Sequence, residues 1–372
     1  MNKSLAIPRA AGAVLRPIAV RAGRLGLKAY VVGGPVRDWL LGRSTYDLDV
    51  VVEGNPAPLA NFCAEELGGR AESFGQFGTW RVLSGKLRVD FATSRRERYP
   101  EPACLPVVST PAPIAEDLVR RDFTINAMAL PLIEKGAAEI VDPYGGLADL
   151  RRRVLRVLHD GSFRDDPTRV FRAARYACRL GFHPAPALTS QARAALDAGH
   201  AARLSPHRLA QELLRILGEQ DPGCALRRLD AWGYLALIRA ALPAPPANLR
   251  TPAERLAAIA LALGEDGEAF LSRLPVDHHL SAPAREALKL AREKAAPRSA
   301  PSPAAARALR AASPKLAVSA LKPLWLHGGD LEELGVKPGP KMGEILNAAA
   351  RAQWEGLLPS RAKALAWLKK RV

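Results

Sequence analysis

An α+β architecture is expected for this chain of 372 residues, with strands confined to its first part and helices in the rest. Short apolar runs that end at glycine turns occur only before about residue 150, which favours a mixed or antiparallel sheet there. Beyond that point Ala and Arg recur with helical periodicity, and Pro stands at predicted helix starts. A chain of this length is predicted to contain several domains, since one domain mostly takes about 100–200 residues.

The first predicted elements form a strand–turn–helix–strand unit. An amphipathic helix at 11–25, kinked or interrupted at Pro17, comes before it. The unit itself comprises a strand at 30–32, two glycines, a short helix at 36–41 and a strand at 48–52. Two acids, Asp47 and Asp49, stand at the start of the second strand. Residues two apart on a strand point to the same side, so these carboxylates converge.

A β-hairpin is predicted next, with a turn at Gly85-Lys86 and Asp90 in its second strand. The polar, proline-rich residues 94–114 are predicted to form a long loop, and loops of that length in compact domains are often functional. Ser205 and Pro206 predict a helix start, with Ser as N-cap. Other expected elements are a helix at 59–67, hairpin strands at 79–84 and 87–92, a helical stretch at 120–129, a short strand and glycine turn at 139–150, and a linker at 295–306.

The balance of charge favours a polyanionic partner. The formal net charge is +17, which suits nucleic acid or an anionic membrane, or reflects an Arg-rich proteome. The N-terminus lacks an unbroken apolar signal segment, and no run of 18 apolar residues occurs, which argues against a membrane. The four cysteines are far apart, without a C-x-x-C spacing, and predict neither a zinc site nor a disulfide framework, as in a reducing cytoplasm.

Asp47 and Asp49 are candidate metal ligands. Two converging carboxylates repel one another unless a cation lies between them, and such a pair can hold two Mg²⁺ ions for phosphoryl chemistry. Asp90 is the candidate third acid on a neighbouring strand. Gly33 and Gly34, upstream of the pair, would let the backbone approach a triphosphate at a helix N-terminus. The alternatives are solvated acids at a strand end and a plain tight turn.

Arg37 and a second cluster, at Arg121, Asp122 and Asn126, are candidate nucleotide contacts. Arg37 would add a positive charge beside the glycines, and Arg121 would serve phosphates. Asp122 and Asn126, four apart on a predicted helix, suit ribose hydroxyls. The alternative for this cluster is a capping aspartate with solvated arginines.

The third cluster, around Asp166 and Arg169, is suited to reading a nucleobase. A carboxylate accepts from an exocyclic amino group and a guanidinium donates to the adjacent ring nitrogen, so such a pair accepts cytosine and adenine and rejects guanine and uracil. Asp165 neighbours the pair. Asp166 before Pro167 is equally suited to capping a helix. Three arginines further along either form a solvated face or bind RNA phosphate: Arg172, Arg175 and Arg179.

Taken together, these motifs resemble the class II tRNA nucleotidyltransferase and poly(A) polymerase family of the polymerase-beta superfamily. The resemblance covers about residues 28–182 densely and continues more weakly to about 235. The motifs, in order, are GGPVRD with DLD, VDFAT, RRDFTINAMA, DPYGGLADLRRRVLRVLH and DDPTRVFRAARYACRLGF. The one departure is Asp165, where Glu is frequent in the family.

The resemblance implies a nucleotidyltransferase head at 1–140, a base-selecting neck at 141–205, and a tRNA-binding helical body at 206–295 and tail at 296–372. It implies Mg²⁺ at Asp47 and Asp49, with base selection by Asp166 and Arg169 beside Asp165 and Arg172. The implied reaction is addition of CMP and AMP from CTP and ATP to the 3′ end of tRNA in the cytoplasm, with no membrane or DNA partner. Triphosphate, ribose and phosphate contacts are implied at Gly33, Gly34, Arg37, Arg121, Asp122 and Asn126.

Three alternatives remain open: addition of the terminal A only, poly(A) polymerisation, and a non-catalytic RNA-binding protein. The retained acid pair disfavours the last of these. Relatives that add only the two cytidines are shortened at the position of 94–114, which is intact here, so that activity is ranked low.

Overall fold

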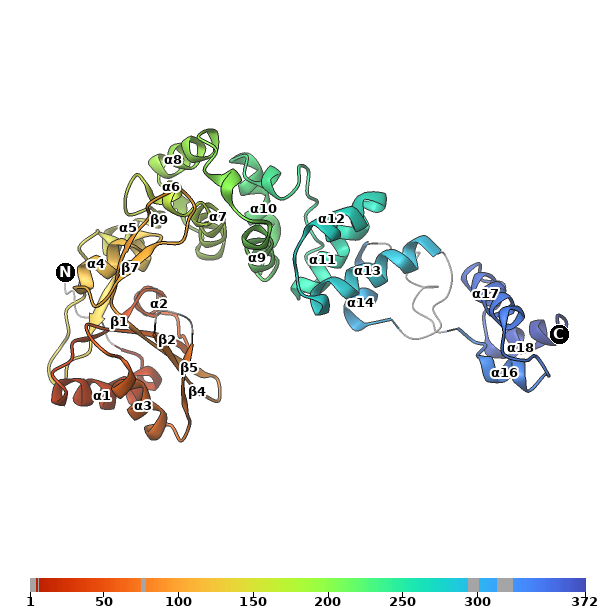
Figure 1. Cartoon of the computed structure of the whole chain (residues 1–372), viewed down its shortest axis with the longest axis horizontal. Coiled ribbons are helices and arrows are strands. Elements are labelled where there is room, and N and C mark those ends of the chain that lie inside the picture. Colours follow the sequence, from red (N-terminus) through yellow and green to blue (C-terminus); the bar gives the residue numbers. More distant parts are fainter. Residues whose placement is uncertain (1–4, 6, 75–77, 294–300, 313–323) are drawn as a thin grey trace. The chain divides into compact units, whose positions relative to one another are not determined.

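The computed structural model describes residues 5, 7–74, 78–293, 301–312 and 324–372. The chain comprises two compact units, Met1–Arg203 and Leu204–Val372 (Figure 1). All described sheets lie in the first unit and the described elements of the second are helical, so the predicted α+β class is confirmed. Among the described residues, no helix is both long and apolar enough to cross a membrane.

A six-stranded mixed sheet organises the first unit, in the order β3-β4-β5-β2-β1-β8. Strands β2 and β5 are parallel and the other neighbouring pairs are antiparallel, because a helix and a hairpin intervene between β2 and β5. The strands are β1 (Ala29–Val32), β2 (Asp47–Val52), β3 (Ala71–Phe74), β4 (Thr79–Ser84), β5 (Leu87–Thr93) and β8 (Ala129–Pro131).

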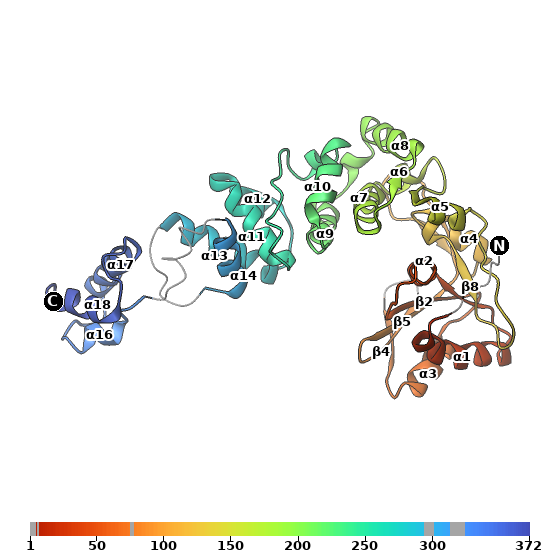
Figure 2. The same cartoon turned by 180° about the vertical axis from the view of Figure 1, so that it is seen from behind.

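Helices cover both faces of this sheet. The helices α1 (Arg9–Arg24) and α3 (Ala57–Glu66) pack together, and α3 packs on β3, β4 and β5. Helix α2 (Gly34–Leu40) lies on the other side of the sheet in both views (Figures 1 and 2). Helix α1 runs continuously through Pro17, so an interruption there is wrong, and the alternative of a kink stays a prediction.

Two predictions between the sheet and the following helices are corrected. The segment 94–114 is not wholly a loop, because it contains a small antiparallel hairpin. The predicted helical stretch at 120–129 is instead a loop with one 3₁₀ turn, and its end pairs as β8 with β1. Tertiary hydrogen bonds override local propensity here: the Thr124 N–H donates to the carbonyl of Arg156. The elements are β6 (Arg96–Arg98), β7 (Val107–Ser109), α4 (Ile114–Val119) and the turn η1 (Thr124–Asn126).

The remainder of the first unit is mainly helical. It nevertheless contains one two-stranded parallel sheet, so the prediction of an all-helical neck is wrong in this detail. The strands are two residues long, too short to give an alternating pattern in the sequence. The predicted strand at 139–150 is reduced to a bridge between Ala129 and Val141. The elements are α5 (Gly146–Arg152), β9 (Val154–Leu155), α6 (Ser162–Asp165), α7 (Thr168–Leu180), β10 (His183–Pro184), α8 (Pro186–Asp197) and the turn η2 (Ala201–Arg203).

The second unit begins as predicted, with Ser205 capping α9 by accepting from the Arg208 N–H. The predicted linker at 295–306 lies partly outside the described residues, and its end opens α14, which packs on α11 and α13. The helices of this unit are α9 (Pro206–Leu217), α10 (Pro222–Ala231), α11 (Pro252–Ala262), α12 (Gly267–Arg273), α13 (His278–Glu293), α14 (Pro303–Ala312), α16 (Gly328–Glu332), α17 (Pro340–Trp354) and α18 (Arg361–Lys369), with the short turns η3 (Leu235–Leu237) and η4 (Gly264–Asp266).

The four cysteines differ in state. Cys63 and Cys104 are free. Cys178 and Cys224 are disulfide-bonded, so the expectation of no disulfide is wrong for these two, because sequence spacing does not reveal bonding partners.

Candidate active site

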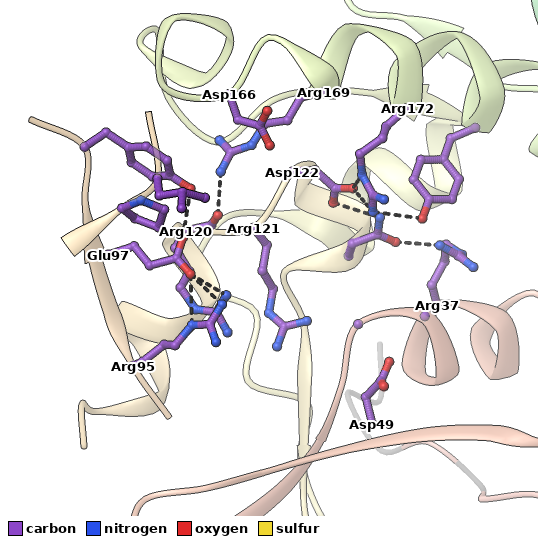
Figure 3. A pocket seen from close by; sticks show the side chains of 17 residues that line it. Arg37, Asp49, Arg95, Glu97, Arg120, Arg121, Asp122, Asp166, Arg169 and Arg172 are labelled. Atoms are coloured by element: carbon purple, nitrogen blue, oxygen red, sulfur yellow. Dashed lines mark hydrogen bonds and ion pairs between the residues drawn. The ribbon is translucent and has the colours of Figure 1, made fainter. Parts of the chain in front are cut away.

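One cavity in the first unit gathers most of the predicted site residues. Its volume is about 520 Å³, and it lies between the sheet and α7 (Figure 3). Predicted residues that line it are Gly33, Gly34, Arg37, Asp49, Arg121, Asp122, Asn126, Asp166, Arg169 and Arg172. Side chains separated by more than a hundred positions in the chain therefore face one space.

The acidic wall of the cavity comes from β2. Asp49 lines the cavity and makes no hydrogen bond or ion pair to a described residue. Burial raises the pKa of Asp49; Arg121 opposes this shift, and the nearby carboxylate of Asp90 adds to it. A partly buried carboxylate without a hydrogen-bonded partner, close to other acids, is suited to bind a cation.

The other two predicted acids lie beside the cavity rather than in its lining. Asp47 is 60% exposed, and its Oδ1 lies 3.4 Å from Arg88 Nε. Asp90 is the register partner of Asp49 on β5, and it accepts two hydrogen bonds of 2.8 Å from Arg81. The proposed role of Asp90 as a third acid therefore stays a prediction, and it would require its ion pair with Arg81 to open.

The donor set fits a divalent cation at two of the three predicted positions. Asp47 and Asp49 lie on the same face of β2, and neither accepts two hydrogen bonds from one arginine of the described structure. No cluster of three or more His, Cys, Asp or Glu side chains that could hold a metal occurs within the described ranges. Two carboxylates leave coordination positions open for phosphate oxygens, which is typical of Mg²⁺ sites that also bind a nucleotide.

The glycine turn lines the same cavity as Asp49, at the N-terminus of α2. Gly33 has φ 72°, a conformation that glycine adopts without strain. A Cβ on Gly33 would lie only 2.8 Å from Arg121 Nη1, so the guanidinium packs directly on this turn. The turn therefore requires glycine for its backbone and for its close contact with Arg121.

A buried hydrogen-bond network connects α2 to α7. Arg37 Nη1 donates to Asn126 Oδ1 at 2.6 Å, and Asn126 Nδ2 donates to Asp122 Oδ1 at 2.9 Å. Arg172 Nε donates to Asp122 Oδ2 at 2.8 Å, and Nη2 of Arg172 reaches the Tyr176 hydroxyl at 3.2 Å (Figure 3). Burial alone would raise the pKa of Asp122, but Arg172 and the Asn126 hydrogen bond hold that pKa below its usual value. Asp122 and Asn126 thus meet as predicted, although not on a helix.

The wall opposite Asp49 comes from α7 and the residue before Pro167. Arg169 is 4% exposed; its Nη1 donates to Ser162 Oγ and its Nη2 to the carbonyl of Arg120, both at 2.7 Å. Asp166 Oδ1 accepts from the backbone N–H and the hydroxyl of Thr168, so Asp166 does bind the first turn of α7, as the capping alternative predicted. Asp166 also lines the cavity. The two side chains face the same space as predicted for a base-reading pair (Figure 3).

Three predicted residues of the helical part are absent from the cavity lining. Asp165 lies at the end of α6, with Oδ2 3.9 Å from His159 Nε2. Arg179 lies over the Tyr176 ring at 5.4 Å, and Arg175 lies on the same helix. Their predicted roles in nucleotide or RNA binding stay predictions.

Seven lining residues were not predicted. Five of them come from the segment 94–114. Its length and its polar, proline-rich composition are the sequence features that could have indicated a functional segment. Arg120 stood in the quoted motif, and Tyr176 lies at helical spacing from Arg169 and Arg172. The seven are Arg95, Glu97, Tyr99, Leu105, Pro106, Arg120 and Tyr176.

Comparison with known proteins agrees with this geometry. A model of the poly(A) polymerase head domain matches residues 29–156, and a model of tRNA nucleotidyltransferase domain 2 matches residues 277–368. The CC-adding tRNA nucleotidyltransferase of Deinococcus radiodurans is 37% identical over 343 residues, 89% of this chain and 86% of the relative. The A-adding enzyme of Aquifex aeolicus is 45% identical over 193 residues, 52% of this chain.

Coverage differs among the relatives. This chain spans only 23% of the length of the Aquifex aeolicus enzyme and 28% of the A-adding enzyme of Geobacter sulfurreducens. The solved structure of the Thermotoga maritima CCA-adding enzyme complexed with tRNA has a TM-score of 0.68 at 25% identity, covering 98% of this chain and 96% of that one.

The strand carrying paired acids, the glycine turn and the mixed sheet place this protein in the class of nucleotidyltransferases with a poly(A) polymerase head. Similarity to tRNA-processing members extends over nearly the whole chain. The chain belongs to the tRNA nucleotidyltransferase family.

Proposed function

We propose that this protein adds CMP and AMP from CTP and ATP to the 3′ end of tRNA, completing or repairing the CCA end and releasing pyrophosphate. The observation that best supports this proposal is that one cavity is lined by three features: Asp49 of β2, the Gly33–Gly34 turn, and the Asp166–Arg169 pair. It joins groups suited to a triphosphate with groups suited to a base. The relatives' names, which specify addition to tRNA, support the choice of acceptor.

In the proposed reaction, the 3′-oxygen of tRNA bonds to the α-phosphorus and its hydroxyl gives up its proton to water. The bond from the α-phosphorus to the bridging oxygen breaks, and pyrophosphate leaves with that electron pair. Two Mg²⁺ ions held by Asp47 and Asp49 would lower the pKa of the hydroxyl and offset the charge on the phosphates. Backbone N–H groups at the start of α2, with Arg37 and Arg121, would bind the triphosphate. Asp122 and Asn126 would bind the ribose.

Base selection is assigned to Asp166 and Arg169 on the opposite wall. Arg169 is held by two neutral acceptors, so its planar donor face is already oriented before a base arrives. A carboxylate beside it accepts the amino group of cytosine or adenine and repels the carbonyl of guanine or uracil. The proposed division is a catalytic head at 1–140, a base-selecting neck at 141–205, and tRNA binding by the helices beyond.

Addition of C alone or of A alone is the second candidate. Similarity over nearly the full length to a CC-adding enzyme favours the first, and local identity to A-adding enzymes favours the second. The segment 94–114 contributes five side chains to the cavity, which supports retention of the A step in this chain.

The test uses purified protein and tRNA ending at the discriminator base or at CC, with CTP, ATP or both. Extension of the shorter tRNA by CCA supports the proposal. Addition that stops at CC, or that occurs only on the CC-ended substrate, would establish one of the alternatives, and long A tails would indicate polyadenylation.

The active site is checked with the double variant Asp47→Ala/Asp49→Ala. Its activity should fall by about 10³-fold or more, since metal assistance contributes several kcal/mol. Glu72→Gln, which removes an exposed carboxylate from edge strand β3 of the same sheet, is the matched control. Equal activity of the double variant and the control would refute the assignment.

A further inference from the structure

Asp117 is a buried carboxylate that belongs to none of the predicted motifs. It lies on α4, and its side chain is 0% exposed. Oδ1 accepts from the backbone N–H of Arg95 at 3.1 Å and from Arg120 Nε and Nη2 at 3.0 and 2.8 Å. Oδ2 accepts from Arg121 Nη2 at 3.0 Å. One carboxylate therefore holds two segments beside the cavity, at Arg95 and at Arg120–Arg121.

The first of these contacts concerns Arg121, which faces Asp49 and the glycine turn. Asp117 is the one described residue that bonds the Arg121 guanidinium through a side chain. Arg121 Nε is buried without a hydrogen-bond partner among the described residues, and Nη1 packs on Gly33. Without Asp117, no described side chain would hold this guanidinium by a hydrogen bond.

The second contact concerns Arg120, whose side chain and carbonyl point to different partners. Its Nη1 donates to Glu97 Oε1 at 3.1 Å, and its carbonyl accepts from Arg169 Nη2 at 2.7 Å (Figure 3). Fixing the Arg120 side chain thus also fixes the carbonyl that orients Arg169. Burial alone would raise the pKa of Asp117, but Arg121 and Arg120 hold that pKa below its usual value, so the carboxylate stays ionised.

We propose that Asp117 is a positioning residue for nucleotide binding, which sets Arg121 against the glycine turn and, through Arg120, sets the base-facing Arg169. This inference rests on the proposed function, since it assumes that the cavity binds a nucleoside triphosphate. Asp117 itself is not assigned a contact with the nucleotide. Its effect is to orient two guanidiniums on opposite walls at once.

Asp117→Asn is the appropriate variant because it keeps the size of the side chain. The new amide nitrogen is a donor and cannot accept from a guanidinium, so the site keeps one acceptor oxygen and loses at least one of its arginine contacts. Glu116→Gln is the matched control: Glu116 is the preceding residue on α4 and pairs with Arg96 of the β6–β7 hairpin, but it does not line the cavity.

The first measurement is equilibrium binding of ATP with Mg²⁺ and of CTP with Mg²⁺, without RNA. We expect Asp117→Asn to weaken binding by roughly 10- to 100-fold, the range expected for the loss of a hydrogen bond between charged groups, while Glu116→Gln binds like the wild type. Equal affinities of the two variants would overturn the inference. This readout does not depend on transfer, so a wild type that binds nucleotide but does not extend tRNA would refute the proposed function alone.

A double-variant cycle separates positioning from a general effect on folding. If Asp117 acts through Arg121, the loss of affinity in Asp117→Asn/Arg121→Ala should be smaller than the product of the two single losses. Losses that multiply would overturn the Arg121 part of the inference. Asp117→Asn should also reduce discrimination of CTP over UTP, and unchanged discrimination would overturn the Arg120–Arg169 part. Melting curves set the assay temperature below the transition of every variant.

Discussion

Asp49 and Asp90 are register partners on the parallel strands β2 and β5, yet among the described residues arginine hydrogen-bonds only one of them. Asp90 is bound by Arg81 through two hydrogen bonds of 2.8 Å, whereas Asp49 faces the cavity without such a partner. Adjacent acids on neighbouring strands thus have different environments. The difference leaves Asp49 as the one of the two carboxylates that has no hydrogen-bonded arginine in the described structure.

The first prediction concerns stability without metal. Because the pKa of Asp49 is raised in the folded protein, its contribution to stability is present at low pH and is lost as pH rises through the folded pKa. Asp49→Asn should therefore raise the melting temperature in metal-free buffer at pH 7.5 by on the order of a few degrees, and the gain should shrink on acidification. Millimolar Mg²⁺ should stabilise the wild type and not the variant. A lower melting temperature for Asp49→Asn would contradict this.

The second prediction concerns the glycine turn. Gly33→Ala should raise the KM for both nucleotides, because a Cβ at this position displaces Arg121 in addition to straining a backbone with φ 72°. Gly42→Ala is a matched control, since Gly42 follows the same helix at φ 71° and its Cβ would meet nothing within 4 Å. Both variants should lose stability from backbone strain, and Gly33→Ala should lose more, because its ψ of −121° lies outside the left-handed helical region. Similar KM values in both variants would show that the contact with Arg121 is unimportant.

The third prediction concerns the network between α2 and α7. Asp122→Asn should lower the free energy of unfolding by about 3 kcal/mol. The substitution removes the negative charge that binds Arg172 and that accepts from Asn126, the partner of Arg37. The pKa of Asp122 is lowered on folding, so its stabilisation is present above the unfolded pKa and is lost as pH falls through the folded one. The free energy of unfolding should be measured with urea at pH 7 and at pH 3. The difference in this free energy between wild type and variant should be smaller at pH 3. A difference independent of pH would rule out the charge as its source.

The fourth prediction concerns the support of Arg169. Ser162 is fully buried and accepts from Arg169 Nη1, so Ser162→Ala should free one end of the guanidinium. Discrimination between CTP and UTP should fall about tenfold, because a hydrogen bond to a charged group contributes about 1.5–3 kcal/mol. Ser190→Ala, which removes an exposed hydroxyl on α8, should leave this ratio unchanged. Retained discrimination in Ser162→Ala would show that the Arg120 carbonyl suffices.

The fifth prediction concerns the second unit. Arg255 is 2% exposed and donates to the carbonyls of Leu249 and Leu217 at 3.0 and 2.6 Å, so it satisfies one backbone acceptor before α11 and one at the end of α9. Arg255→Met should destabilise the unit by about 3 kcal/mol, because these carbonyls lose their donors. Arg250→Met, at an exposed position beside α11, is the control. Limited proteolysis and melting would report the loss, and equal stability of both variants would exclude a structural role for Arg255.

Local patterns in the sequence were sufficient to predict much of this protein. The acids of β2, the two hairpin strands and the capped start of α9 follow from alternation, turn residues and capping, which act over a few neighbouring residues. The motif order also placed Asp49, Asp122 and Arg169 in one candidate site, and the cavity contains all three.

Features that depend on contacts between distant segments required the folded chain. The stretch around Asp122 has helical spacing, but its backbone bonds to Arg156, and the segment 94–114 forms a hairpin whose residues line the cavity. Asp117 shows both cases: its pairs with Arg120 and Arg121 have the local i+3 and i+4 spacing, whereas only the fold brings the backbone N–H of Arg95 to the same carboxylate. Propensity and spacing act locally, whereas burial removes the competing water and makes such long-range charged hydrogen bonds decisive.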